Sequence, residues 1–301
     1  MPEIIIHGAS SFLGKHFARR RYSNNIPFII VARNKSDLSV WENLQGIKLL
    51  RYNNSIGEIN LNIESSSTFY EFSWQGVFGV DRNDPSQITT NIPLIISSIE
   101  FAHRIGSKHW IGIGSQAEYG NLDKKISESD FCNPTTLYGK SKLISGNISK
   151  ELCKSFNMEH SWLRLFSVYG PDDNHEWLIQ YLIKKMLKNE PIDVTKAEQI
   201  WDYLFVEDIS DLLLKLSNSG GVGIANLGSG NGIVVKEIIN IIKDKTGSNS
   251  IINFGAIPYR PDQVMKMEAD IKKLREHTGW SPNTDFETGI QKTINSLMVK
   301  N

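Results

Sequence analysis

The first half of the chain alternates short apolar runs with longer segments in which apolar residues recur at helical spacing. Three segments have helical spacing: Leu13–Tyr22, Ile88–Ile105 and Thr135–Phe156. Six apolar runs have the length of strands: Glu3–His7, Phe28–Ala32, Ile47–Tyr52, Thr68–Ser73, Lys108–Ile113 and His160–Phe166. Several of these runs are unbroken, which is typical of strands covered by helices on both faces. The pattern predicts an α/β fold with a doubly wound parallel sheet.

The alternation stops after Tyr169-Gly170-Pro171. The helical patterns that follow cover His175–Leu187, Val206–Leu216 and Val234–Asp244. Extended pieces lie near Ile192 and Ile200, at Ile224–Gly232 and at Ile251–Phe254, and two helical segments end the chain. We predict a smaller mixed α/β domain here, from which some segments return to the first sheet. The domain built on the first sheet would then comprise residues 1–168 plus about 203–226, and the smaller domain about 169–202 and 227–301.

Composition narrows the class of protein. The 301 residues carry 33 Lys and Arg against 33 Asp and Glu, and 40% are hydrophobic, which is enough for a sizeable core. No block of like charge suggests a nucleic-acid or anionic-membrane partner, and no apolar run approaches the ~20 residues that a bilayer requires. Two cysteines and seven histidines match no metal spacing, so we predict no metal. The N-terminus lacks a basic leader, so we expect the cytoplasm; an exported protein with one disulfide is the alternative.

A turn of small residues joins the first strand to the first helix with the spacing G-x-x-S-x-x-G. Gly8 permits a sharp turn, and Gly14 permits close packing of the helix on the sheet. The N–H groups at the helix start suit a pyrophosphate. A plain strand–helix turn is the alternative interpretation. We predict a dinucleotide site formed by Gly8, Ser10, Ser11, Phe12, Leu13 and Gly14.

The end of the second strand indicates which nicotinamide cofactor is bound. An acid at this position would bind the ribose 2′-hydroxyl, whereas an arginine would pair with a 2′-phosphate. Arg33 stands there, and the first acid is Asp37. We therefore predict NADP(H) in preference to NAD(H); the alternative is that Arg33 is a solvated loop charge.

Three residues have the spacing and context of an acid–base site. Tyr138 and Lys142 lie one helical turn apart, so an ammonium there is expected to lower the pKa of the phenol from ~10. Ser115 ends a strand at the carboxyl edge of the predicted sheet, where α/β folds place their ligands. Its hydroxyl could bind a reacting oxygen beside Tyr138. Taken singly, the pair is typical of a helix surface and the serine of a backbone turn.

These motifs together resemble the extended short-chain dehydrogenase/reductases, in particular those that act on nucleotide sugars. The resemblance runs along nearly the whole chain and rests on Gly8–Gly14, Ser115 with Glu118-Tyr119-Gly120, Pro134–Lys142, Arg164–Pro171, Asp202–Asp208, Asn226–Gly230 and Tyr259-Arg260-Pro261. It implies a Rossmann domain with a C-terminal substrate domain, and Ser115, Tyr138 and Lys142 as the catalytic set. It also implies a homodimer formed through Ile88–Ile105 and Thr135–Phe156.

The residues beside the serine separate the activities within this family. Similar dehydratases carry Asp-Glu directly after the catalytic hydroxyl residue, but here Gln116 and Ala117 follow Ser115, and neither side chain does acid–base work. The segments around Ser115, Trp201 and Arg260 resemble bacterial reductases of dTDP- or CDP-linked 4-keto-6-deoxyhexoses, enzymes of O-antigen and related polysaccharide assembly. A C4 epimerase with tightly bound NAD is the alternative, and a non-catalytic NADP-binding sensor is the weaker one.

The resemblance implies a mechanism for the reductase. Hydride from NADPH would reach C4 of the keto sugar while Tyr138 donates a proton to the oxygen. Ser115 would orient the carbonyl, Lys142 would hold the ribose, and Ser115, Gln116 and Arg260 would contact the nucleotide sugar. Trp74 would line the cofactor cleft or pack in the core. Asp202 and Asp208 belong to a segment that joins the domains.

Overall fold

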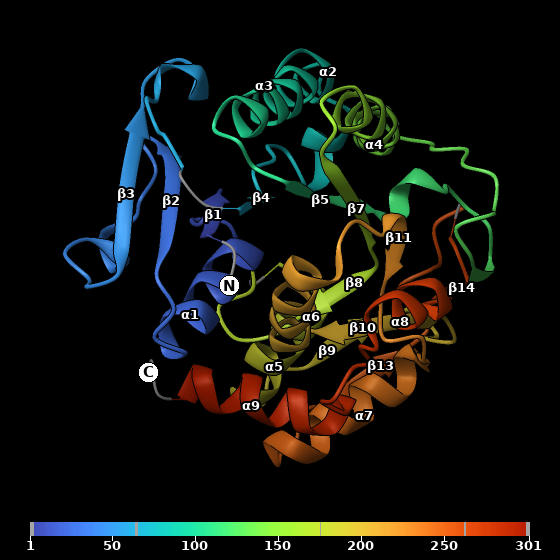
Figure 1. Ribbon diagram of the computed structural model, residues 1–301. Coiled ribbons are helices and arrows are strands. Elements are labelled where there is room, and N and C mark those ends of the chain that lie inside the picture. Colours follow the sequence, from blue (N-terminus) through green and yellow to red (C-terminus); the bar gives the residue numbers. More distant parts are fainter. Residues whose placement is uncertain (1–2, 64–65, 175, 262, 299–301) are drawn as a thin grey trace.

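A seven-stranded parallel sheet organises the larger part of the molecule (Figure 1). The computed structural model describes residues 3–63, 66–174, 176–261 and 263–298. The strand order is β11-β7-β5-β4-β1-β2-β3. The bounds are β1 (Glu3–His7), β2 (Phe28–Arg33), β3 (Ile47–Tyr52), β4 (Ser67–Glu71), β5 (His109–Ser115), β7 (Glu159–Leu165) and β11 (Gly223–Leu227). The predicted doubly wound parallel sheet is confirmed.

Helices cover both faces of this sheet, as the unbroken apolar strands require. In β1, Ile4 and Ile6 belong to the core on one face and Ile5 to the core on the other, and all three are buried. One face carries α3 (Asn91–Arg104) and α4 (Leu137–Ser155), preceded by the short α2 (Ser86–Thr89). The other carries α1 (Phe12–Ser23) and α6 (Val206–Ser219).

A second, smaller sheet lies below the first in Figure 1. Its order is β12-β10-β14-β6, and β8 pairs with β10. These strands are β6 (Lys124–Ile126), β8 (Ser167–Tyr169), β10 (Ile200–Phe205), β12 (Gly232–Val234) and β14 (Lys266–Ala269). A two-stranded sheet joins β9 (Ile192–Val194) to β13 (Ile252–Phe254). The helices of this part are α5 (Leu178–Leu187), α7 (Val235–Thr246), α8 (Lys272–Thr278) and α9 (Phe286–Met298). The predicted domain boundaries stay a prediction.

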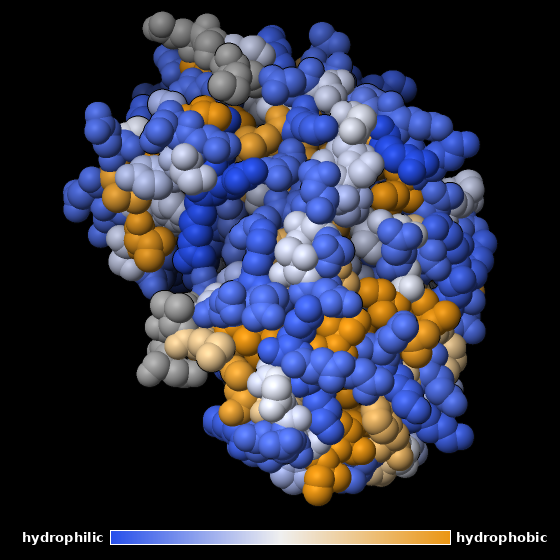
Figure 2. Space-filling view, turned by 90° about the horizontal axis from the view of Figure 1, so that it is seen from below, coloured by the Kyte–Doolittle hydropathy of each residue, from blue (hydrophilic) through white to orange (hydrophobic). Residues whose placement is uncertain are grey.

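The underside of the molecule belongs to this smaller part. Figure 2 shows apolar patches there between hydrophilic side chains, on the side of α7 and α9 and opposite to α3 and α4. Helices α5 and α7 pack together, as do α7 and α9. They enclose a separate apolar core that includes Tyr169, Ile183, Ile239 and Ile290. Among the helices that the structure describes, none combines the length and apolar character needed to cross a membrane.

The predicted elements differ from the observed ones mainly where they are short or interrupted. The predicted helix Ile88–Ile105 is two helices, because α2 ends at Thr89 and α3 begins at Asn91. The predicted helix from His175 begins at Leu178, and His175 lies outside the described residues. Strands β6, β8, β12 and β14 were not predicted. They contain three or four residues each, too few for a periodic pattern.

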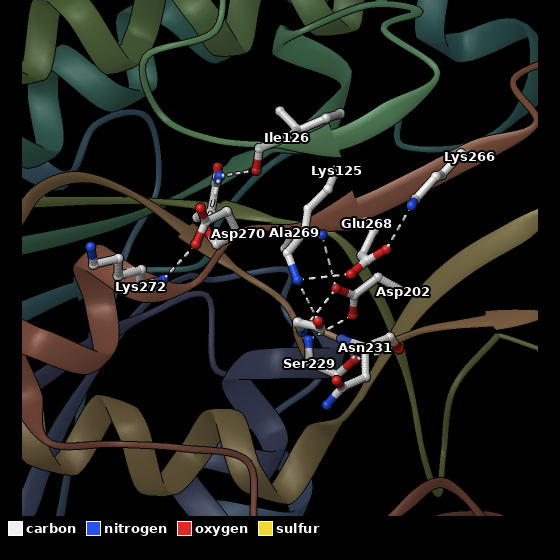
Figure 3. Close-up of polar contacts among 12 residues, drawn as sticks. Lys125, Ile126, Asp202, Ser229, Asn231, Lys266, Glu268, Ala269, Asp270 and Lys272 are labelled. Atoms are coloured by element: carbon white, nitrogen blue, oxygen red, sulfur yellow. Dashed lines mark hydrogen bonds and ion pairs between the residues drawn. The ribbon is translucent and has the colours of Figure 1, made fainter.

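Two buried aspartates connect the parts of the fold. Asp202 of β10 accepts hydrogen bonds from the backbone N–H groups of Ser229, Gly230 and Ala269, at 2.6, 2.9 and 3.0 Å (Figure 3). It therefore ties β10 to β14 and to the loop after β11. Asp208 accepts hydrogen bonds from the N–H and hydroxyl of Thr284.

Candidate active site

The glycine turn forms one end of the candidate site. Gly8 has φ +86°, a left-handed conformation that favours glycine. A Cβ at Gly14 would lie 2.2 Å from the carbonyl oxygen of Gly8, so the helix approaches the turn more closely than any side chain permits. Ser11 is the N-cap of α1, and its hydroxyl accepts a hydrogen bond from Gly14 N–H at 3.1 Å.

The same turn has the properties of an anion site. In the part of the chain that the structure describes, the N–H groups of Phe12 and Leu13 at the start of α1 have no protein acceptor. Ser10 is exposed beside them. Unpaired N–H groups at a helix start, with the helix dipole behind them, fit a pyrophosphate. The residues present therefore fit a dinucleotide cofactor.

Arg33 ends β2, next to this turn in the sheet order. Its side chain is half-buried, and no ion pair joins it to any acid among the described residues. The first acid after Arg33 in the sequence, Asp37, accepts hydrogen bonds from the N–H and hydroxyl of Ser39 at 3.1 and 2.9 Å. Arg51 fixes the intervening loop by donating to two of its carbonyl oxygens. A cation without a carboxylate therefore stands at the end of β2.

Ser115 is held rigidly at the carboxyl end of β5. Its Oγ accepts a hydrogen bond from Ala117 N–H at 3.2 Å and donates to Gln116 Oε1 at 3.0 Å. The carboxylate of Glu118 accepts from Ser115 N–H at 2.9 Å, which completes a capping box. Gln116 therefore lies directly beside the serine hydroxyl.

A buried ion pair supports this segment from behind. Glu118 is fully buried, and its Oε2 lies 2.7 Å from Nε of Arg164 on β7. Its Oε1 accepts a hydrogen bond from the indole of Trp162 at 2.9 Å. Both carboxylate oxygens are thus bonded, which offsets the cost of burying the charge. The pair fixes the orientation of Ser115 through the capping box.

Tyr138 is positioned by the first turn of α4. Thr136 is the N-cap and accepts a hydrogen bond from Gly139 N–H at 3.1 Å. A Cβ at Gly139 would lie 2.4 Å from the carbonyl oxygen of Ala117, so α4 packs directly on the segment after Ser115. This close packing brings Tyr138 near the Ser115 hydroxyl, which favours the ionised form of the phenol.

Lys142 lies one turn further along α4 and is also buried. Its Nζ donates to the carbonyl oxygen of Ile113 at 2.7 Å and lies 3.6 Å from the centre of the Trp74 ring. Burial disfavours the ammonium and lowers the pKa of Lys142 to about 7. The amine is 5.9 Å from the centre of the Tyr138 ring. The structure thus places Trp74 against α4, in contact with the Lys142 amine.

The prediction of a lowered phenol pKa is wrong for this structure. Burial raises the pKa of Tyr138 above its ordinary value, and the nearby hydroxyl of Ser115 and the charge of Arg82 oppose this rise. Lys142 does not act as the neighbouring cation, because its amine is directed to the Ile113 carbonyl and its own charged form is disfavoured.

Arg82 also lies at the site, although no motif in the sequence predicts it. The Cζ atom of its guanidinium lies 4.5 Å from the centre of the Tyr138 ring. Arg82 comes from η3 (Gly79–Asn83) in the loop that follows β4. The one feature of the sequence that could have indicated Arg82 is its place as a basic residue in the turn-rich segment after the fourth strand, at the carboxyl edge of the sheet.

The predicted residues fall into two sets. Ser115, Gln116, Tyr138 and Lys142 come together, and the glycine turn and Arg33 end strands at the same edge of the sheet. Arg260 is exposed on the segment between β13 and β14, and among the described residues it has no contact with Tyr138. Its contact with substrate stays a prediction.

Comparison with known proteins gives relatives along nearly the whole chain. CDP-abequose synthase from Salmonella muenchen is 29% identical over 310 residues, which cover 97% of both chains. A dTDP-4-dehydro-6-deoxyglucose reductase from Escherichia coli is 29% identical over 188 residues, 60% of this chain and 58% of that protein. The crystal structure of UDP-glucose 4-epimerase from Thermotoga maritima, with UDP-glucose, has a TM-score of 0.84 at 22% identity and covers 99% of each chain.

A family model agrees with the fold and with the sequence motifs. The model described as the NAD dependent epimerase/dehydratase family matches residues 4–228. This range contains the glycine turn, Ser115, Tyr138 and Lys142. The predicted membership of the extended short-chain dehydrogenase/reductases is confirmed, and so is the prediction of an NAD(P)-dependent enzyme. The chain belongs to the NAD dependent epimerase/dehydratase family.

Proposed function

We propose that this chain is an NADPH-dependent reductase of the C4 keto group in a nucleotide-linked 4-keto-6-deoxyhexose. The observation that carries the proposal is the Ser115–Tyr138 pair with Gln116 and Ala117 beside it. This arrangement supplies one proton donor and a hydroxyl that orients a carbonyl. It supplies no carboxylate at the two positions where the similar dehydratases carry acids.

Each side chain has a role that its contacts support. Tyr138 donates its O–H proton to the C4 oxygen as the carbonyl becomes an alcohol. Ser115, locked by its capping box, donates a hydrogen bond to the same oxygen and orients it. Lys142 holds the cofactor ribose with its amine. A bound dihydronicotinamide supplies the hydride.

The relatives support this choice of substrate. Two of them are named for CDP-abequose and for dTDP-4-dehydro-6-deoxyglucose, both of which are nucleotide-linked sugars. Epimerases are also among the relatives. An epimerase retains its cofactor through the catalytic cycle, whereas a reductase exchanges it at every turnover. The cation at the end of β2 favours a cofactor of the NADPH type and therefore the reductase.

Cofactor choice is tested at Arg33. In the wild type we expect a lower KM for NADPH than for NADH, because the guanidinium pairs with the 2′-phosphate. Arg33→Ala should reduce this preference about tenfold or more, with little change for NADH. Lys35→Ala, on the exposed part of the same loop, is the matched control. An unchanged KM ratio in Arg33→Ala would remove the NADP assignment.

The reaction is tested with purified protein, NADPH and CDP- or dTDP-4-keto-6-deoxyglucose. We expect NADPH absorbance to fall with one of these substrates, and NMR of the product identifies the new C4 alcohol. Tyr138→Phe should lower kcat by about 10²-fold or more while leaving NADPH affinity nearly unchanged. Protein that carries stoichiometric NAD and interconverts sugars without added cofactor would instead be an epimerase. Dinucleotide binding without turnover would identify the sensor.

We also propose a homodimer that pairs α3 and α4 with their copies. These helices lie together on one outer face of the sheet (Figure 1). Ile144 of α4 is 42% exposed and Ile88 of α2 is 44% exposed, so each presents apolar surface outward. Ile144→Lys is expected to yield monomers in sedimentation experiments, whereas Ile251→Lys, at another exposed isoleucine, is not.

A further inference from the structure

Two buried amides hold the loop that follows β4. Gln87 and Asn91 are fully buried, and Asn91 Nδ2 donates to Gln87 Oε1 at 3.1 Å. The side-chain nitrogen of Gln87 donates to the carbonyl oxygens of Gly76 and Asp81 at 2.5 and 2.9 Å. Its oxygen accepts from the indole of Trp74 at 2.9 Å. The conformation of this loop is therefore fixed by hydrogen bonds from buried side chains.

Arg82 stands between two anchors of this loop. On one side, the carbonyl of Asp81 is bound by Gln87. On the other, the side-chain oxygen of Asn83 accepts a hydrogen bond at 3.1 Å from the backbone N–H of Leu137, the first residue of α4. Because Leu137 precedes Tyr138, Asn83 attaches the loop directly to the turn that carries the phenol. This attachment places the guanidinium on the Tyr138 ring at 4.5 Å.

The charges around Tyr138 come from three elements. Arg82 of η3 lies on its ring, Lys142 of α4 lies one turn along the helix, and Glu118 of η4 (Gln116–Glu118) lies behind Ser115. Glu118 acts against ionisation of the phenol, but its carboxylate is bonded to Arg164. The amine of Lys142 is bonded to a backbone carbonyl. Arg82 has no acid partner among the described residues, so its guanidinium is the cation left to act on the phenol.

We propose that Arg82 is the positioning residue that makes Tyr138 an effective proton donor, acting as a fixed cation on the face of its ring. This inference rests on the proposed function. In the reduction, Tyr138 gives its O–H proton to the sugar oxygen and becomes a phenolate, which then regains a proton from solvent. The guanidinium stabilises that phenolate and so strengthens the acid. Lys142 is thereby left for the cofactor ribose.

The test measures the ionisation of Tyr138 without turnover. Protein labelled with ¹³Cζ-tyrosine is titrated by NMR, and the Tyr138 signal is the one that disappears in Tyr138→Phe. We expect Arg82→Gln to move the Tyr138 transition to higher pH. Arg82→Lys keeps the charge and should restore much of the wild-type position. Lys140→Gln removes a cation from the exposed side of the same helical turn and should leave the transition in place.

Kinetics provide the second measurement. Reduction requires the protonated phenol, so activity falls as pH rises through the pKa of Tyr138. Arg82→Gln should move this alkaline limb to higher pH and lower kcat about tenfold, with an unchanged KM for NADPH. Arg82→Lys should recover most of the lost kcat.

The outcomes separate the two proposals. A shifted NMR transition in a protein without reductase activity supports the role of Arg82 and rejects the reductase. An unmoved transition in folded Arg82→Gln overturns the role of Arg82, even if the reductase is active. A higher KM for the sugar nucleotide with an unmoved transition also overturns it and makes Arg82 a substrate contact. If Arg82→Gln does not fold, Asn83→Ala decides, because it releases the loop that carries Arg82 from the start of α4. A Tyr138 transition at the wild-type pH in Asn83→Ala would overturn the proposal.

Discussion

The glycine turn after β1 and the loop after β4 are neighbours, but the first is held by local contacts and the second by residues of later helices. They touch, because a Cβ at Gly8 would lie 2.7 Å from the backbone nitrogen of Ser73. The glycine turn takes its shape from residues within seven positions of one another, with Ser11 as its own cap. The β4 loop takes its shape from Gln87 and Asn91, which belong to later helices.

Under the proposed function, this difference assigns cofactor binding to the glycine turn and proton transfer to the side chains held by the β4 loop. The glycine turn offers backbone N–H groups, which any sequence with the right conformation provides. The β4 loop offers the side chains of Trp74 and Arg82, which contact Lys142 and Tyr138. Damage to the turn should therefore affect dinucleotide affinity, and damage to the loop should affect kcat.

The largest expected effect is at Gly14. The Cβ of Gly14→Ala would meet the Gly8 carbonyl oxygen at 2.2 Å, so the helix or the turn must move. We expect loss of dinucleotide binding in calorimetry and a loss of about 3 kcal/mol in the free energy of unfolding. Gly57→Ala is the control, since its Cβ would meet only Ser55 Oγ at 3.4 Å. Wild-type dinucleotide affinity in Gly14→Ala would contradict the tight packing.

Gln87→Leu should have the next largest effect. It removes the bonds to Trp74, Gly76 and Asp81 and leaves buried polar groups unpaired, at a cost of about 2–3 kcal/mol in urea unfolding. We expect kcat to fall at least tenfold while the dinucleotide Kd changes less than about twofold. Gln45→Leu, at an exposed glutamine, is the control. A dinucleotide Kd that changes as much as kcat would contradict the separate roles of the glycine turn and the β4 loop.

The contribution of the buried Lys142 to the free energy of unfolding should depend on pH. Its pKa is about 7 in the folded chain against 10.5 ordinarily, so between these values the unfolded chain binds more protons. The contribution of Lys142 to stability therefore rises with pH across this window and is least favourable below about pH 7. Lys142→Met should be more stable than the wild type near pH 6, and this advantage should shrink toward pH 10. If the free energies of unfolding of the wild type and of Lys142→Met changed in parallel with pH, the lowered pKa of the buried amine would be contradicted.

The smallest effects come from a matched pair of helix caps. Ser11→Ala removes the local cap of α1, and Asn83→Ala removes the bond from the β4 loop to the start of α4. Each should cost about 1 kcal/mol in thermal unfolding. Ser11→Ala should raise the KM for NADPH, whereas Asn83→Ala should lower kcat. The same kinetic change in both variants would remove the distinction between the two regions.

The sequence predicts what depends on near neighbours. The central strands, the turn at Gly8 and the one-turn spacing of Tyr138 and Lys142 all follow from local patterns, and the structure has them in place. The direction of the Lys142 amine and the position of Arg82 do not. Each depends on packing between elements distant in the chain, such as Asn83 with Leu137, which are 54 residues apart. No periodicity within one segment carries that information.

The course of the chain also affects how the protein is made. Strand β11 pairs with the edge of β7. In the sequence, however, it follows β8, β9 and β10, which belong to the other two sheets. A nascent chain that has emerged as far as Leu165 therefore presents an unpaired, apolar strand edge, which is a site for aggregation. This edge stays unprotected until synthesis has reached Leu227, the last residue of β11. Chains that end between Leu165 and Leu227 should therefore be insoluble.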